Sequence, residues 1–127
     1  MKILAVIVVI LGLASAVLGV IFTINSGTAQ NEVADSIAPL PLDQLDARYE
    51  TVKSSQMAMA AQEGQAIQNG QAPSEMYSWL TLQRTSLGLA RSNAGLSQLT
   101  LTLGIVNIVI GVGLILTGIV VFRRAAV

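Results

Sequence analysis

Residues 3–24 read ILAVIVVILGLASAVLGVIFTI, 22 residues without a charged side chain. Residues 101–122 read LTLGIVNIVIGVGLILTGIVVF and likewise carry no charge. About 20 apolar residues in a helix cross the hydrocarbon core of a bilayer, and leucine, isoleucine and valine favour insertion. The sequence therefore predicts an all-α membrane protein, in which two transmembrane helices form an antiparallel hairpin with an extracytoplasmic helical bundle segment between them.

The two apolar stretches divide the chain into four parts. We assign a first transmembrane helix to residues 1–24, an extracytoplasmic helical segment to 25–98, a second transmembrane helix to 99–122 and a cytoplasmic tail to 123–127. A cleaved signal peptide is the alternative for the first span, because Ala14-Ser15-Ala16 fits a cleavage site. The apolar run continues beyond Ala16, which favours an uncleaved anchor.

The composition excludes several classes of function. Only 11% of the 127 residues are charged, against about 25% in an ordinary soluble domain. Histidine and cysteine are both absent, which removes disulfides, thiol nucleophiles, imidazole bases and the usual zinc sites. Seven basic and seven acidic residues cancel, so no excess of positive charge points to nucleic acid. We expect no catalytic activity, cofactor, metal or nucleic-acid partner.

The charges nevertheless have an uneven distribution that predicts the orientation in the membrane. Lys2 precedes the first span, and Arg123 and Arg124 follow the second. All seven acidic residues lie between the spans together with four basic ones, which gives that segment a net charge of −3. Basic flanks remain cytoplasmic. We therefore expect a multi-pass protein of the cytoplasmic (inner) membrane of a prokaryote, with both termini cytoplasmic and the central segment outside.

Small and polar residues recur at seven-residue spacing in both apolar helices. One row consists of Ala90, Ser97, Gly104, Gly111 and Gly118, and the other of Ala5, Gly12, Gly19 and Ser26. Small residues let helix backbones approach each other inside a membrane, where the hydrophobic effect cannot drive association. The predicted helix-packing seam comprises Gly12, Ser15, Gly19, Ser26, Ser97, Thr100, Gly104, Asn107, Gly111 and Gly118. We expect the spans to pack on each other, with contact to a second copy or a foreign subunit as the alternative.

Asn107 is the strongest hydrogen-bonding group within the second span. A side-chain amide in hydrocarbon seeks a partner on a neighbouring helix, and Ser15 and Ser26 are the candidates. The alternative role is a solute or proton pathway. For the seam itself, leucine at position 104 or 111 should disrupt packing, whereas leucine in place of Ile108 or Ile115 should be neutral.

Local signals divide the central segment into helices. Pro39 and Pro41 end a first helix that extends beyond the membrane, and Asp43 is expected to cap the next helix. That helix should end near Asn69-Gly70, and Ser74 should cap the last one. The last helix contains no proline before Phe122, and a bend is expected at residues 93–95, where glycine weakens it.

An aromatic and methionine cluster opens this last helix. We expect Met76, Tyr77, Trp79 and Leu80 to cover a small core that includes Val52, Met57 and Met59. The alternative is that Met76, Tyr77 and Trp79 form a tip that contacts a partner protein. Further along the helix, the arginines at positions 84 and 91 are expected to pair with acids of the preceding helix, namely Asp43, Asp46 or Glu50.

These features favour one function over two others. We expect a small non-catalytic integral membrane protein that acts through protein contacts as an accessory, assembly or scaffold subunit, with a membrane protein or a second copy as partner. One alternative is an extracytoplasmic sensor or ligand-binding module for an unknown small molecule. The other is a component of an oligomeric pore or transporter. The order of elements resembles bacterial chemoreceptor sensor domains in layout alone.

Overall fold

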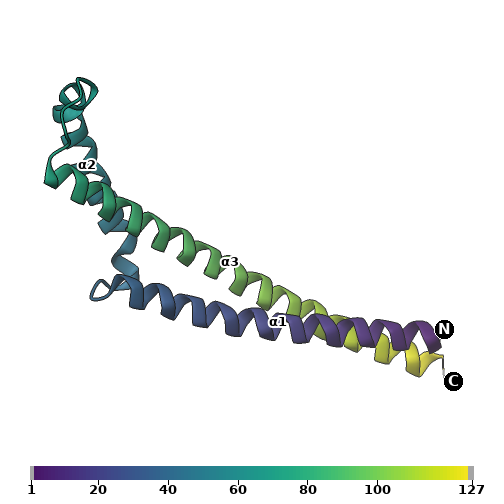
Figure 1. Cartoon of the computed structure of the whole chain (residues 1–127). Helices are drawn as coiled ribbons and strands as arrows, with labels where there is room; N and C mark the ends of the chain where they lie inside the picture. Colours follow the sequence, from purple (N-terminus) through teal and green to yellow (C-terminus); the bar gives the residue numbers. More distant parts are fainter. Residues whose placement is uncertain (1, 126–127) are drawn as a thin grey trace. The chain divides into compact units, whose positions relative to one another are not determined.

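The computed structural model describes residues 2–125, and every regular element in that range is a helix. The elements are α1 (Lys2–Ile37), the 3-10 helix η1 (Leu42–Gln44), α2 (Leu45–Gln68) and α3 (Glu75–Arg124) (Figure 1). The predicted all-α class is therefore confirmed, and α1 continues beyond its apolar stretch to Ile37.

The chain forms two compact units. The two-helix unit contains the described residues up to Ala29 and those from Leu96 onward, and the central unit spans Gln30–Gly95. The division falls after Gly95, the glycine at which the sequence predicts a bend, while α3 itself is one uninterrupted helix. Each unit has its own packing, described separately below.

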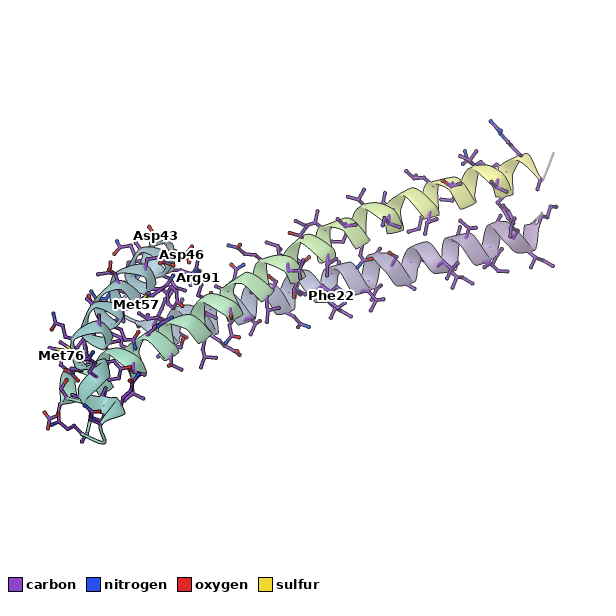
Figure 2. The ribbon with its side chains drawn as sticks, turned by 90° about the horizontal axis from the view of Figure 1, so that it is seen from above. Phe22, Asp43, Asp46, Met57, Met76 and Arg91 are labelled. Carbon is purple, nitrogen blue, oxygen red and sulfur yellow. The ribbon has the colours of Figure 1, made fainter. Side chains whose placement is uncertain are left out.

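Both long helices carry the apolar stretches. α1 and α3 are each long and apolar enough to cross a membrane, judged by length and composition. Only 17% and 11% of their most apolar windows are buried. Figure 2 shows the corresponding hydrocarbon side chains, which project outward from both ribbons. Most of the apolar surface of the two-helix unit is therefore exposed.

α2 ends just before Asn69-Gly70, as the sequence predicts. Asn69 is the C-cap, and Gly70 adopts a left-handed conformation with φ of +87°. The Gly70 N–H donates to the Ile67 carbonyl at 3.0 Å, and the Gln71 N–H donates to the Ala66 carbonyl at 3.0 Å. This pair of bonds is the Schellman motif, which satisfies carbonyls that the helix end leaves unpaired.

The start of α2 differs from the prediction at Asp43. This residue lies inside η1, and the N-cap of α2 is Gln44, which makes no side-chain capping bond. The reason is local, because the Gln44 N–H already donates to the Pro41 carbonyl at 3.1 Å and closes a tighter turn before the α-helix begins. The predicted Asp43 cap is therefore wrong.

The central unit is organised around a small apolar core. Its buried members are Val33, Leu45, Val52, Leu80, Leu87 and Ala90. Partly buried Tyr49 and Met59 pack against them from α2. The core thus joins the end of α1 to α2 and to the first half of α3 within this unit.

Candidate functional site

The candidate site is the seam between α1 and α3 in the two-helix unit. Eight members of the two seven-residue rows are buried there: Ala5, Gly12, Gly19 and Ser26 on α1, and Ser97, Gly104, Gly111 and Gly118 on α3. The ninth, Ala90, is buried in the core of the central unit. Positions on the two rows meet in pairs, Gly12 with Gly111 and Gly19 with Gly104. Because the residue numbers of the paired glycines rise along α1 as they fall along α3, the two helices run antiparallel in this unit (Figure 1).

At the glycines the two backbones are in direct contact. A Cβ atom added to Gly111 would lie 2.6 Å from the Ala16 nitrogen and 2.6 Å from the Gly12 carbonyl oxygen. A Cβ added to Gly19 would lie 2.6 Å from the Gly104 carbonyl oxygen. No real Cβ approaches backbone atoms so closely, so any side chain at these positions forces the helices apart. The spacing of the helices is therefore set by residues that lack a side chain.

Two isoleucines flank this contact. The Cβ position of Gly19 lies 2.7 Å from Ile108 Cγ1, and that of Gly12 lies 2.9 Å from Ile115 Cγ1. Ile108 and Ile115 therefore line the seam and are not the uninvolved control positions that the sequence suggested. The matched controls are Gly27 and Gly113, whose Cβ positions have no neighbouring atom within 4 Å.

Two serine contacts link the helices at different levels of the seam. Ser26 Oγ donates to the Ser97 carbonyl at 2.7 Å, and Ser97 Oγ donates to the Ser26 carbonyl at 2.8 Å. Further along, Ser15 Oγ donates to the Asn107 carbonyl at 3.0 Å. These polar contacts add to dispersion between the closely spaced backbones.

The role predicted for the Asn107 amide differs from what the structure shows. Asn107 is half-buried, and Ser15 bonds its backbone carbonyl rather than its side chain. The close approach of the helices explains this, because it brings main-chain oxygens within reach of a short hydroxyl. Thr100 also stays on its own helix and donates to the Leu96 carbonyl at 2.9 Å. One seam residue that the sequence analysis missed is Thr23, whose Oγ1 lies 2.7 Å from the Cβ position of Gly104.

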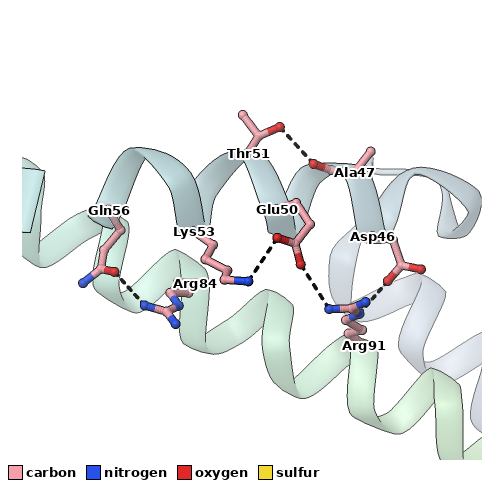
Figure 3. Close-up of polar contacts among 8 residues, drawn as sticks. All are labelled: Asp46, Ala47, Glu50, Thr51, Lys53, Gln56, Arg84 and Arg91. Atoms are coloured by element: carbon pink, nitrogen blue, oxygen red, sulfur yellow. Dashed lines mark hydrogen bonds and ion pairs between the residues drawn. The ribbon is translucent and has the colours of Figure 1, made fainter. Parts of the chain in front are cut away.

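In the central unit, Arg91 joins α3 to α2. Its guanidinium lies 2.7 Å from Asp46 and 3.4 Å from Glu50 (Figure 3). It also lies 5.2 Å from the centre of the Tyr49 ring. The predicted pairing of this arginine with acids of the preceding helix is confirmed. All three charged side chains are substantially exposed, so solvent screens the attraction.

Arg84 makes a different contact from the one predicted. Its guanidinium donates to Gln56 Oε1 at 2.7 Å instead of to an acid (Figure 3). Gln56 is buried, and its Nε2 donates to the Tyr77 hydroxyl at 3.4 Å. Sequence periodicity missed Gln56, because an amide on a helix is ordinarily assigned to the solvent side.

Glu63 connects α2 to the first turn of α3. Its carboxylate accepts the Ser74 N–H at 3.0 Å and the Ser74 hydroxyl at 2.6 Å. Ser74 Oγ in turn accepts the Tyr77 N–H at 3.1 Å, which confirms the predicted cap. The hydrogen bonds from the Ser74 side chain and backbone hold the pKa of the Glu63 carboxyl below its ordinary value.

The aromatic and methionine cluster divides between core and surface. Leu80 is buried in the core, and Tyr77 is half-buried. Met76 and Trp79 are 54% and 52% exposed, and with Ser74 and Glu75 they line an open depression. Met57 is also exposed. The expectation that these residues form part of the small core is therefore wrong for Met57, Met76 and Trp79.

A cleft of about 540 Å³ lies elsewhere in the central unit. It is lined by Ile37, Pro39, Leu40, Pro41, Gln44, Arg48, Gln83 and Leu87. Within the described residues, Gln83 Oε1 is buried without a hydrogen-bond partner. Such an acceptor gains free energy from any donor that reaches it.

The basic residues that predict the topology lie together at one end of the two-helix unit. Arg123 and Arg124 are in the last turn of α3, and the contact of Ala5 with Gly118 places Lys2 at the same end. In the range 2–125, no three His, Cys, Asp or Glu side chains are grouped to hold a metal ion. Comparison with protein-family models, curated proteins and solved structures finds no match to this chain.

Proposed function

We propose that the chain is a small non-catalytic integral membrane protein that acts through protein contacts as an accessory, assembly or scaffold subunit. A core helix of a soluble protein would be largely covered, whereas 17% and 11% of the apolar windows of α1 and α3 are buried. Lipid is the solvent that suits such exposed leucine, isoleucine and valine surfaces. The glycine rows support this assignment, because small residues are how membrane helices pack.

The topology we propose places residues 3–24 and 101–122 in the bilayer of a prokaryotic inner membrane. Lys2, Arg123 and Arg124 then remain on the cytoplasmic side, in accordance with the positive-inside rule. The central unit, which holds all seven acidic residues, lies on the other side.

The observation that carries the contact role is the exposure of Met76 and Trp79 beside each other on one turn of α3. Tryptophan and methionine are enriched at protein interfaces, and tryptophan is prominent among residues that dominate binding energy. The glycine rows are already occupied by contacts within the chain, which leaves this tip as the more suitable surface for a partner protein.

The experiment is purification of the full chain from its own membrane in mild detergent, after proximity labelling in the cell. The double substitution Met76→Ser and Trp79→Ser should abolish co-purification of the partner, while Leu89→Ser should retain it. Leu89 is the matched control because it is 62% exposed on the same helix. A monomer that labels and retains no protein would contradict the proposal, as would equal capture by both variants.

The cleft at Gln83 favours a second candidate function, an extracytoplasmic ligand-binding or sensor module. Its apolar lining residues, the Gln83 acceptor and the lining residue Arg48 suit a small amphipathic molecule with a hydrogen-bond donor and an acidic group. A thermal-shift screen of the full chain against such acids should show stabilisation that is lost in Gln83→Leu. The absence of any shift would count against this function.

A further inference from the structure

An apolar groove runs along the α1–α3 pair at the end of the two-helix unit that carries the basic residues. It has a volume of about 380 Å³ and is lined by Ala5, Val6, Val9, Ile10, Ile119, Phe122 and Arg123. That volume falls in the range of roughly 300–1,000 Å³ of small-molecule sites. Among the residues that the structure describes, Arg123 is the one charged lining residue and the nearest of them to the end of α3.

The groove follows from the small residues beneath it. Ala5 is buried against Gly118, where the two backbones are close together. Larger side chains near that contact, Val6 on α1 and Phe122 on α3, line the groove and are 46% and 44% exposed. Its walls are hydrocarbon, so its occupant within a membrane is a hydrocarbon chain.

Arg123 places a basic side chain in the lining of the groove, near the end of α3. The two-helix unit contains no Asp or Glu side chain, and its basic residues are Lys2, Arg123 and Arg124. No acidic side chain of the same unit is therefore available to neutralise Arg123. A guanidinium binds phosphate oxygens through paired hydrogen bonds, and anionic headgroups attract basic residues at the cytoplasmic face.

We infer that this groove binds one acyl chain of an anionic phospholipid, whose headgroup phosphate pairs with Arg123. The inference rests on the proposed membrane location and deepens it by naming the lipid class and the site. The acyl chain contacts the apolar lining residues Val6, Ile10, Ile119 and Phe122. Arg123 provides the preference for a headgroup with a net negative charge.

The test measures the melting temperature of the full chain in detergent micelles titrated with dioleoylphosphatidylglycerol or dioleoylphosphatidylcholine. Two matched pairs of variants separate the site from its surroundings. Arg123→Gln alters the groove and Arg124→Gln does not, while Val6→Trp fills the groove and Ile7→Trp adds the same ring at its neighbour. Val6 and Ile7 are 46% and 48% exposed, so both pairs avoid the buried seam.

We expect the anionic lipid to raise the melting temperature of the unaltered chain, of R124Q and of I7W. Affinity for it should fall about fivefold in R123Q, the effect of one basic residue at an anionic surface. V6W should lose the response to both lipids. The proposed site would be contradicted if the two lipids raised the melting temperature equally. It would also be contradicted if both members of either pair of variants lost the response to the same extent.

Flotation with neutral phosphatidylcholine vesicles is a separate measurement that tests the membrane location itself. A chain that floats with these vesicles but shows no groove effect contradicts this inference and leaves the proposed function intact. A chain that does not float contradicts both.

Discussion

Ser26 and Ser97 each donate a hydroxyl hydrogen bond to the backbone carbonyl of the other, across the seam between α1 and α3. Both are almost fully buried, at 1% and 4% exposed. Buried hydroxyls require partners, and here each residue supplies both a donor and an acceptor to the other. The contact is a two-fold polar clamp in a row of otherwise small apolar residues.

Replacement of either serine with alanine should therefore destabilise the helix pair by about 1 kcal/mol, the usual net value of a buried hydrogen bond. The double variant should lose less stability than the two single variants added together, because both hydrogen bonds depend on the same alignment of α1 with α3. Denaturation in mixed micelles measures these costs. Thr28→Ala is the control, since that hydroxyl bonds its own helix at Ile24; equal costs at Ser26 and Thr28 would show that the clamp contributes nothing.

Gly111→Ala should destabilise the same pair by about 1–3 kcal/mol, the range for overpacked sites. The added methyl would meet the backbone of α1 at 2.6 Å, and neither helix can yield there without separating from the other. The same denaturation assay applies. Gly113→Ala, two residues away and facing open space, should be neutral or slightly stabilising because alanine favours helix. If the two alanines behave alike, the backbone contact is not what holds the pair.

The two arginines of the central unit should differ in importance. Arg91→Met should cost less than about 1 kcal/mol and matter less in high salt, because its ion pairs are exposed. Arg84→Met should cost about 1–3 kcal/mol at any salt concentration, since it leaves the buried Gln56 amide oxygen without its donor. Chemical denaturation of the two variants at low and high salt distinguishes them, and a reversed order would contradict this assignment.

The junction between α2 and α3 should loosen in acid. Because hydrogen bonds from Ser74 lower the pKa of Glu63 from its ordinary value of 4.5, the folded junction favours the charged carboxylate. Its stabilisation is present above pH 4.5 and is lost as the pH falls through the lowered pKa.

Amide hydrogen exchange at Tyr77, the residue that Ser74 caps, reports this change. Glu63→Gln should lower the protection of this amide, relative to the exchange rate of an unstructured chain at the same pH, and should flatten the acid dependence of that protection. Glu32→Gln, which removes an exposed carboxylate of α1, should leave both unchanged. An unaltered acid profile in Glu63→Gln would show that another group controls the junction.

The features that were predictable from sequence are those encoded by a residue type at its own position. Gly70 ends α2 and Ser74 caps α3 because each supplies its local requirement without reference to a distant neighbour. The two small-residue rows belong to the same class, since a seven-residue period is visible in one helix at a time.

The features that were not predictable depend on what lies opposite. Whether Arg84 meets an acid or Gln56 is decided by the alignment of α3 on α2, which neither helix encodes alone. Ser26 and Ser97 both belong to the predicted seam, but their pairing requires the alignment of α1 with α3. Periodicity likewise cannot tell that Trp79 faces away from the core while Leu80 faces into it.

The seven-residue rows have a consequence for how the helices find their register. Sliding α1 past α3 by seven residues, roughly 10 Å along the axis, would place Gly12 opposite Gly104 and Ala5 opposite Gly111, again small against small. The glycines thus tolerate several offsets of nearly equal fit. The slipped pair would put Ser97 against Gly19, which has no hydroxyl to exchange. Glycine therefore determines how closely the helices approach, and the serine pair determines which offset they adopt.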